Sequence, residues 1–196
     1  MGTTIFLNII SLFYVFLLAG VYFSKERIKN FENSIFSTLV IAIISQLLTG
    51  LLIYYTMINF TDNISLNKIF NKIYLTTILL WIIQFTMYTF IISFKKVDFK
   101  KVSRIFNTIY FILIIIMFIL PLELKYIDEN TMYSNGPSIN LLYLTSIICI
   151  SVMTISVIKN RKNIINKKYL PLLSFILFGV FVLIIQLIII RHIKKK

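Results

Sequence analysis

Cysteine and charged side chains are scarce in this chain. A single cysteine among 196 residues excludes a disulfide framework within the chain. Charged residues make up 14% of the sequence and hydrophobic residues 59%, whereas soluble domains average about 25% and about 45–50%. The same figures exclude intrinsic disorder, which requires low hydrophobicity. The composition therefore indicates a protein whose solvent is lipid.

Catalytic signatures are missing from the sequence as well. It contains no phosphate-binding loop, no H-E-x-x-H, no G-x-S-x-G and no cysteine–histidine cluster with metal-ligand spacing. The one histidine, His192, follows the last apolar run without the neighbours that catalysis or phosphotransfer requires. Cys149 lies within an apolar run and is expected to be a packing residue with an unreactive thiol. We predict no catalytic residue, no metal and no cofactor in this chain.

Six long apolar runs are present instead. A helix needs about 20 apolar residues to cross the hydrocarbon core of a bilayer, and continuous runs favour helices over the alternating strands of a barrel. The fourth run ends at Pro121, which cannot continue a helix, and Pro171 stands where a first helical turn begins. We predict an all-α polytopic membrane protein, a single bundle of six transmembrane helices. The predicted spans are residues 5–23, 35–58, 69–94, 105–120, 139–158 and 170–190.

Basic residues gather in alternate connections between these runs. The first, third and fifth connections carry thirteen Lys and Arg residues, and the second and fourth carry three. Cytoplasmic loops hold the excess of Lys and Arg, so we predict a cell-membrane protein with its amino terminus outside. Short basic clusters between apolar runs also point to a lipid bilayer as partner rather than to nucleic acid, despite the net charge of +13. With six spans the basic residues 191–196 would lie outside, so we expect either a seventh span beyond them or a sixth run that does not cross fully.

Neutral polar side chains lie deep in the predicted spans, where ionisable residues are absent. This absence argues against a proton-coupled pump. Gln46, Gln84 and Gln186 fall near the middles of three different spans, so they either bond helices together or line a shared ligand pocket. Trp81 lies mid-span and either packs in the bundle or stacks on a ligand. Lys72, about one turn into the third run, is expected to extend to the headgroups.

The longest connection, residues 121–138, is the second candidate site. It is acidic overall and is predicted to face outside, where it either contacts an external ligand or simply joins two helices. Asn135-Gly136-Pro137 indicates a turn, and Ser138 is expected to cap the next helix. The residues of this connection proposed to contact a ligand are Glu123, Asp128, Glu129 and Tyr133.

Several segments resemble the multi-pass membrane sensor region of sensor histidine kinases from AT-rich Firmicutes. They are 21–28 (VYFSKERI), 71–74 (NKIY) followed by 80–81 (LW), and 133–140 (YSNGPSIN). The resemblance covers most of the chain, through motifs that are diffuse and hydrophobic. It implies a membrane input region that feeds a cytoplasmic dimerisation helix, a phosphoacceptor histidine and an ATP-binding domain. No motif of those three parts occurs in these residues, so the kinase activity is not carried over. A homodimer and a cytoplasmic kinase module as partners are compatible with the resemblance.

Two functions therefore remain open at this point. One is the sensor region of a histidine kinase, and the other is a six-helix substrate-binding subunit of a small-molecule importer, which length and span number also fit. A membrane enzyme is disfavoured, because no catalytic constellation is present. A kinase reading frame directly downstream of Lys196 would support the sensor, and an adjacent ATPase operon would support the importer.

We expect the purified chain neither to bind ATP nor to phosphorylate itself. The reason is the absence of a phosphate-cradling loop together with the isolation of His192. The measurement is incorporation of label from radioactive ATP into the detergent-solubilised protein. Label at His192 would contradict this expectation.

Overall fold

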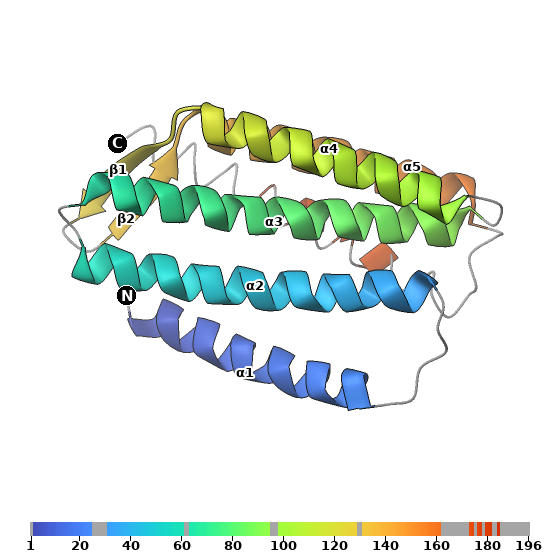
Figure 1. Cartoon of the computed structure of the whole chain (residues 1–196), viewed down its shortest axis with the longest axis horizontal. Helices are drawn as coiled ribbons and strands as arrows, with labels where there is room; N and C mark the ends of the chain where they lie inside the picture. The colour runs from blue at the N-terminus through green and yellow to red at the C-terminus, as the bar shows by residue number, and fades with distance from the viewer. Residues whose placement is uncertain are drawn as a thin grey trace.

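The chain folds into long helices that lie side by side, successive ones running in opposite directions, with a small β-hairpin at one end (Figure 1). The computed structural model describes residues 2–24, 31–60, 63–94, 98–128 and 131–161, and the positions 173, 174, 176, 177, 179–181 and 184. The helices are α1 (Gly2–Ser24), α2 (Phe31–Asn59), α3 (Ile64–Ser93), α4 (Phe99–Ile119) and α5 (Pro137–Lys159). The strands β1 (Glu123–Asp128) and β2 (Thr131–Asn135) connect α4 to α5.

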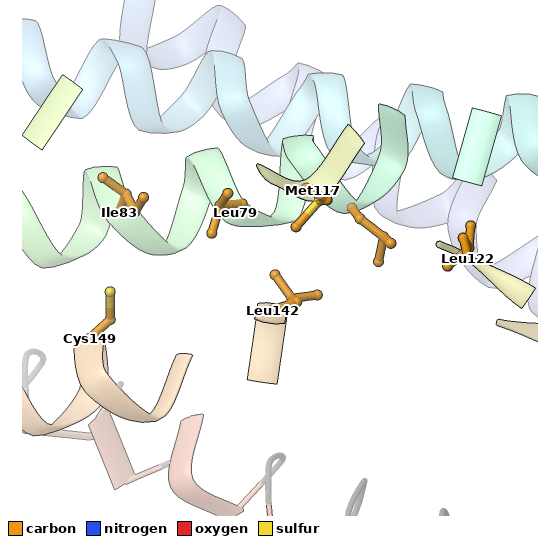
Figure 2. Close-up of a cluster of buried hydrophobic side chains, with 7 residues drawn as sticks. Leu79, Ile83, Met117, Leu122, Leu142 and Cys149 are labelled. Atoms are coloured by element: carbon orange, nitrogen blue, oxygen red, sulfur yellow. The ribbon is translucent and has the colours of Figure 1, made fainter. Parts of the chain in front are cut away.

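Helix α3 occupies the centre of the bundle and packs against α2, α4 and α5. Leu79 and Ile83 of α3 meet Met117 of α4 and Leu142 and Cys149 of α5 in one buried cluster (Figure 2). Burial of the Cys149 side chain in this cluster agrees with the packing role expected for it.

A second buried cluster joins α3 to α2 and to the start of α4. Met87 and Ile91 of α3 pack with Ile35 and Leu39 of α2 and with Val102 of α4. Since α3 contributes to both clusters, it is the helix through which the other elements are held together.

Four helices within the described ranges are long and apolar enough to cross a membrane, which indicates a multi-pass membrane protein. These are α2 from Asn33 onward, α3, α4 and α5. In the first predicted span, residues 8–24 of α1 form a shorter apolar helix. The sixth predicted span, 170–190, lies largely outside the described residues. The positions described between 173 and 184 are helical, and Ile176 is buried against Met153 and Val157 of α5.

The helices begin earlier in the sequence than the apolar runs do. Helix α3 begins at Ile64 rather than at residue 69, because the Asn63 side chain accepts a hydrogen bond from Leu66 N at 3.0 Å. Helix α4 begins at Phe99 rather than at residue 105, because Asp98 accepts from the amides of Lys100 and Lys101. Side-chain oxygens at this position satisfy amides that have no partner in the first turn. The caps therefore lie outside the hydrophobic pattern that predicted the spans. At its other end α4 stops as predicted, one residue before the extended Leu120 that precedes Pro121.

The connection predicted as a loop contains the antiparallel hairpin of β1 and β2. Glu123 pairs with Asn135 and Lys125 with Tyr133, and an irregularity interrupts the register between Tyr126 and Asp128. Gly136 follows β2 with φ of +117°, a conformation that L side chains rarely adopt. A Cβ at this position would lie 3.1 Å from the Pro121 carbonyl oxygen. Glycine thus allows the chain to pass close to the end of α4 before α5 begins.

Truncation of the central packing residue of α3 tests this arrangement. Leu79→Ala would leave a cavity in the cluster shared by α3, α4 and α5, and we expect it to lower the free energy of unfolding by about 2–5 kcal/mol. The measurement is reversible unfolding of the protein in bicelles by a denaturing detergent. Leu144→Ala on the exposed side of α5 is the matched control, because that side chain is 57% exposed. Equal losses for the two variants would show that α3 is not the centre of the packing.

Candidate functional site

The C-terminal end of α4 is bound from two neighbouring helices. The Lys72 ammonium of α3 donates to the carbonyl oxygens of Phe118 at 2.6 Å and Leu120 at 2.8 Å. The Ser138 hydroxyl of α5, which is fully buried, lies 3.0 Å from the Leu120 carbonyl oxygen. It is also within 3.3 Å of the carbonyl oxygens of Met117 and Pro121. The last carbonyls of a helix lack intrahelical partners and carry partial negative charge, so both donors stabilise this end. We refer to Lys72, Ser138 and these four carbonyls as the α4 clamp.

The α4 clamp bears on two sequence expectations. The Lys72 ammonium forms charge-assisted hydrogen bonds to the carbonyls of α4, and its position at the headgroup level stays a prediction. Ser138 does not cap α5. The N-cap position belongs to Gly136 and Pro137 is the first helical residue, so Ser138 falls inside the first turn and donates to α4 instead.

A second set of hydrogen bonds connects the hairpin to α3. The Ser134 hydroxyl of β2 donates to Asn71 Oδ1 of α3 at 2.8 Å. Asn71 Nδ2 donates to the Asn67 carbonyl at 2.9 Å, and Asn67 Nδ2 donates to the Phe60 carbonyl at 3.0 Å. Asn67 is 1% exposed, and its Oδ1 atom has no hydrogen-bond partner within the described part of the chain. Asn71 and Lys72 are consecutive, so one point on α3 holds both the hairpin and the end of α4.

The glutamines proposed to share a pocket make separate contacts. Gln84 Nε2 donates to Asn107 Oδ1 of α4 at 3.3 Å, and the buried Gln84 Oε1 has no partner among the residues described. The Gln46 side chain interacts with the Tyr74 hydroxyl across the interface of α2 and α3. Where side chains are described, no hydrogen bond joins the two glutamines. Gln186 lies outside the described residues, so the shared pocket stays a prediction.

The remaining candidates from the sequence are placed as follows. The Trp81 ring stacks on Phe85 with centroids 5.7 Å apart and packs beside the cluster of α2, α3 and α4. In the hairpin, Glu123 and Lys125 are exposed and their charged atoms are 4.0 Å apart. Asp128 and Tyr133 belong to β1 and β2, and Glu129 lies outside the described residues.

The comparisons with known proteins add no relative to this picture. No family model, no curated protein and no solved structure matches the chain.

The asparagines beneath the hairpin were not identified from the sequence. Asn63, Asn67 and Asn71 recur every fourth residue at the start of α3. That spacing puts them on one face of a helix, and it could have indicated a polar stripe at this end of the third span. The partner, Ser134, is more than sixty residues away in the chain, so the pattern alone contains no information about it.

Loss of the Lys72 ammonium should destabilise the hairpin end of the bundle. Lys72→Met keeps most of the side-chain volume and removes both bonds to α4, and hydrogen bonds to charged groups are worth about 1.5–3 kcal/mol each. Because the two bonds share one partly exposed ammonium, we expect the free energy of unfolding to fall by about 1.5–3 kcal/mol in total rather than per bond, with faster amide hydrogen exchange at the end of α4. Lys68→Met, one turn earlier on α3, is the control. If both variants behaved alike, the α4 clamp would have no role in stability.

Proposed function

We propose that this chain is a membrane-embedded sensor region that passes a change at the hairpin to the opposite end of the bundle through α3. The observation that carries the proposal is the link of Ser134 to Asn71 directly beside the bonds of Lys72 to α4. A sensor requires an element outside the hydrocarbon core that is attached to a rigid element crossing that core. In this proposal the hairpin is the outer element and α3 is the helix that crosses.

The physical basis of such a relay is the position of α3 within the core. A displacement of β2 would move Asn71, and Lys72 would move with it because the two residues are neighbours in the same helix. Helix α3 is packed on α2, α4 and α5 along its length, and close-packed interiors transmit displacement rather than absorb it. At the far end of α3, Met87 and Ile91 contact α2 and α4.

The distribution of charge supports an external position for the hairpin. The described basic residues at the hairpin end are Lys68 and Lys72 of α3 and Lys125 of β1. At the opposite end, where α4 begins and α5 ends and which we call the basic end, they are Lys100, Lys101, Arg104, Lys159 and Arg161. In the sequence, the first, third and fifth connections carry thirteen basic residues. On the positive-inside tendency the basic end is cytoplasmic. Reporter fusions within the connection of α2 to α3, in the hairpin and after Lys196 test this orientation and the side on which the tail lies.

We expect Ser134→Ala to alter the arrangement of the basic end, some 30 Å away by the length of α3. The variant removes the hydroxyl that donates to Asn71. The measurement is the distance distribution between spin labels at Phe94 and Asn160, after α3 and α5 end. Ser24→Ala is the matched control, since that hydroxyl donates to the Gly20 carbonyl of its own helix. Identical distributions in wild type and Ser134→Ala would exclude a relay through this contact.

A second candidate function is supported by the unpartnered Gln84 Oε1 beside Asn107. Amides at mid-span suit a neutral polar ligand, as expected for the substrate-binding subunit of an importer. The two functions predict different neighbouring genes and different activities. Ligand-dependent uptake with an adjacent ATPase operon would favour the importer, whereas phosphotransfer by a kinase encoded directly downstream, altered by Ser134→Ala, would favour the sensor.

A further inference from the structure

Three basic side chains gather in the first two turns of α4. Lys100, Lys101 and Arg104 are exposed there. Arg104 follows the two lysines by four and three residues, and this spacing puts all three side chains on one side of the helix. Like charges at this spacing repel each other, and the N-terminal end of a helix adds partial positive charge. The start of α4 therefore concentrates positive charge on one exposed surface.

The described part of the chain provides no counter-ion for these three side chains. No ion pair found within it involves Lys100, Lys101 or Arg104. The neighbouring carboxylate, Asp98, accepts from the amides of Lys100 and Lys101 at 3.0 and 3.3 Å. It stabilises the start of the helix rather than pairing with a side chain. An anion from outside the chain would relieve the remaining repulsion.

An exposed apolar surface continues along α4 from Arg104. With 3.6 residues per turn, Phe111 and Ile115 lie on the same side of the helix as Arg104 and opposite the buried Val102. The Phe111 side chain is 65% exposed and the Ile115 side chain 47%. Positive charge at one end and apolar side chains beyond it match the headgroup and the acyl chains of a phospholipid. We call this surface the α4 strip, and it comprises Lys100, Lys101, Arg104, Phe111, Ile115 and Phe118.

The depths of these side chains in a bilayer also match the parts of a lipid. Helix α4 has 21 residues, and at about 1.5 Å per residue its length is close to the hydrocarbon thickness of about 30 Å. Arg104 is the sixth residue, and side chains in a helix incline toward its N-terminus. The guanidinium therefore extends to the level of the phosphates. Thr108 is exposed one turn deeper, and its hydroxyl, which has no hydrogen-bond partner in the described ranges, can donate to a lipid ester carbonyl.

We infer that the α4 strip binds one acidic phospholipid, with its phosphate among the three basic side chains and an acyl chain along the exposed apolar ones. The Arg104 guanidinium can bind a phosphate through two parallel hydrogen bonds, and the two lysines add charge around it. The lipid carries a net negative charge, because a choline headgroup would return a positive charge to a surface that is already positive. Free phosphate has no chains to lie along Phe111 and Ile115.

The end of α5 carries basic side chains at the same end of the bundle without this arrangement. Lys159 lies in the last turn of α5, where a positive side chain is stabilised by the partial negative charge of the helix end. The dipole thus favours Lys159 and disfavours the cations at the start of α4. Lys159 is exposed, so it serves as the control for attraction between lipid and positive charge in general.

The first test is native mass spectrometry of the full chain titrated with phosphatidylglycerol or phosphatidylcholine. We expect the first phosphatidylglycerol to bind more tightly than phosphatidylcholine, and Arg104→Gln to raise its dissociation constant about fivefold. Arg104→Lys keeps the charge without the paired donors, so its effect should be smaller, and Lys159→Gln should have none. Glycerophosphoglycerol, the headgroup without chains, should not displace the bound lipid at equal concentration. Circular dichroism of each variant verifies that the helices are retained.

The second test locates the lipid in a bilayer. In a Trp81→Phe background, the fluorescence of Phe111→Trp should be quenched more strongly by phosphatidylglycerol with brominated acyl chains than by the same amount of brominated phosphatidylcholine. Addition of Arg104→Gln should abolish this preference. Leu144→Trp on the exposed side of α5 is the control and should be quenched equally by both lipids.

Four results would each overturn the inference. They are equal affinity for the two lipids, an equal effect of Arg104→Gln and Lys159→Gln, displacement of the lipid by glycerophosphoglycerol, and the same quenching preference at Phe111→Trp and Leu144→Trp.

Discussion

The carbonyl groups at the C-terminal end of α4 receive hydrogen bonds from two other helices. A helix leaves its last four carbonyls without intrahelical partners, and backbone polar groups that are shielded from water cost free energy when they are left unpaired. Lys72 and Ser138 satisfy these groups from α3 and α5. The same bonds determine where the hairpin starts and where α5 begins, because Gly136 must pass close to Pro121 for Ser138 to reach α4.

Helix α3 gives this end of the molecule its connection to the rest. Asn71 and Lys72 hold the hairpin and α4, and Leu79 and Ile83 continue the same helix into the core. Polar contacts at one end and apolar contacts along the span thus belong to a single rigid element. Because of this continuity, the proposed relay runs through α3 rather than through α1, which packs against α2 at the edge of the bundle.

The sequence interpretation succeeded where a proline or a run of apolar residues marks the feature, and it failed where the feature depends on polar side chains. The end of α4 before Pro121 and the burial of Cys149 were anticipated, since a proline and an apolar environment act locally. The helix starts were placed several residues late, because Asn63 and Asp98 are polar and fall outside an apolar pattern. The hairpin was missed entirely, since its strands lie in a connection rich in polar residues, where turn signals outweighed any alternation. Gln46 and Gln84 were identified as polar groups in the spans, but their partners, Tyr74 and Asn107, were not.

What the sequence determined by itself is the presence of long apolar helices in the described ranges and the uneven distribution of basic residues among the connections. These properties depend on composition over one helix length, and each helix satisfies its own backbone hydrogen bonds in lipid. Only the tertiary structure decided which helix occupies the centre and which carbonyls Lys72 and Ser138 bind. The physical reason is that lipid chains are as apolar as leucine. Hydrophobicity therefore favours a helix in the membrane but does not determine which helices pack against it. Side-chain packing and hydrogen bonds between residues far apart in the chain determine the neighbours.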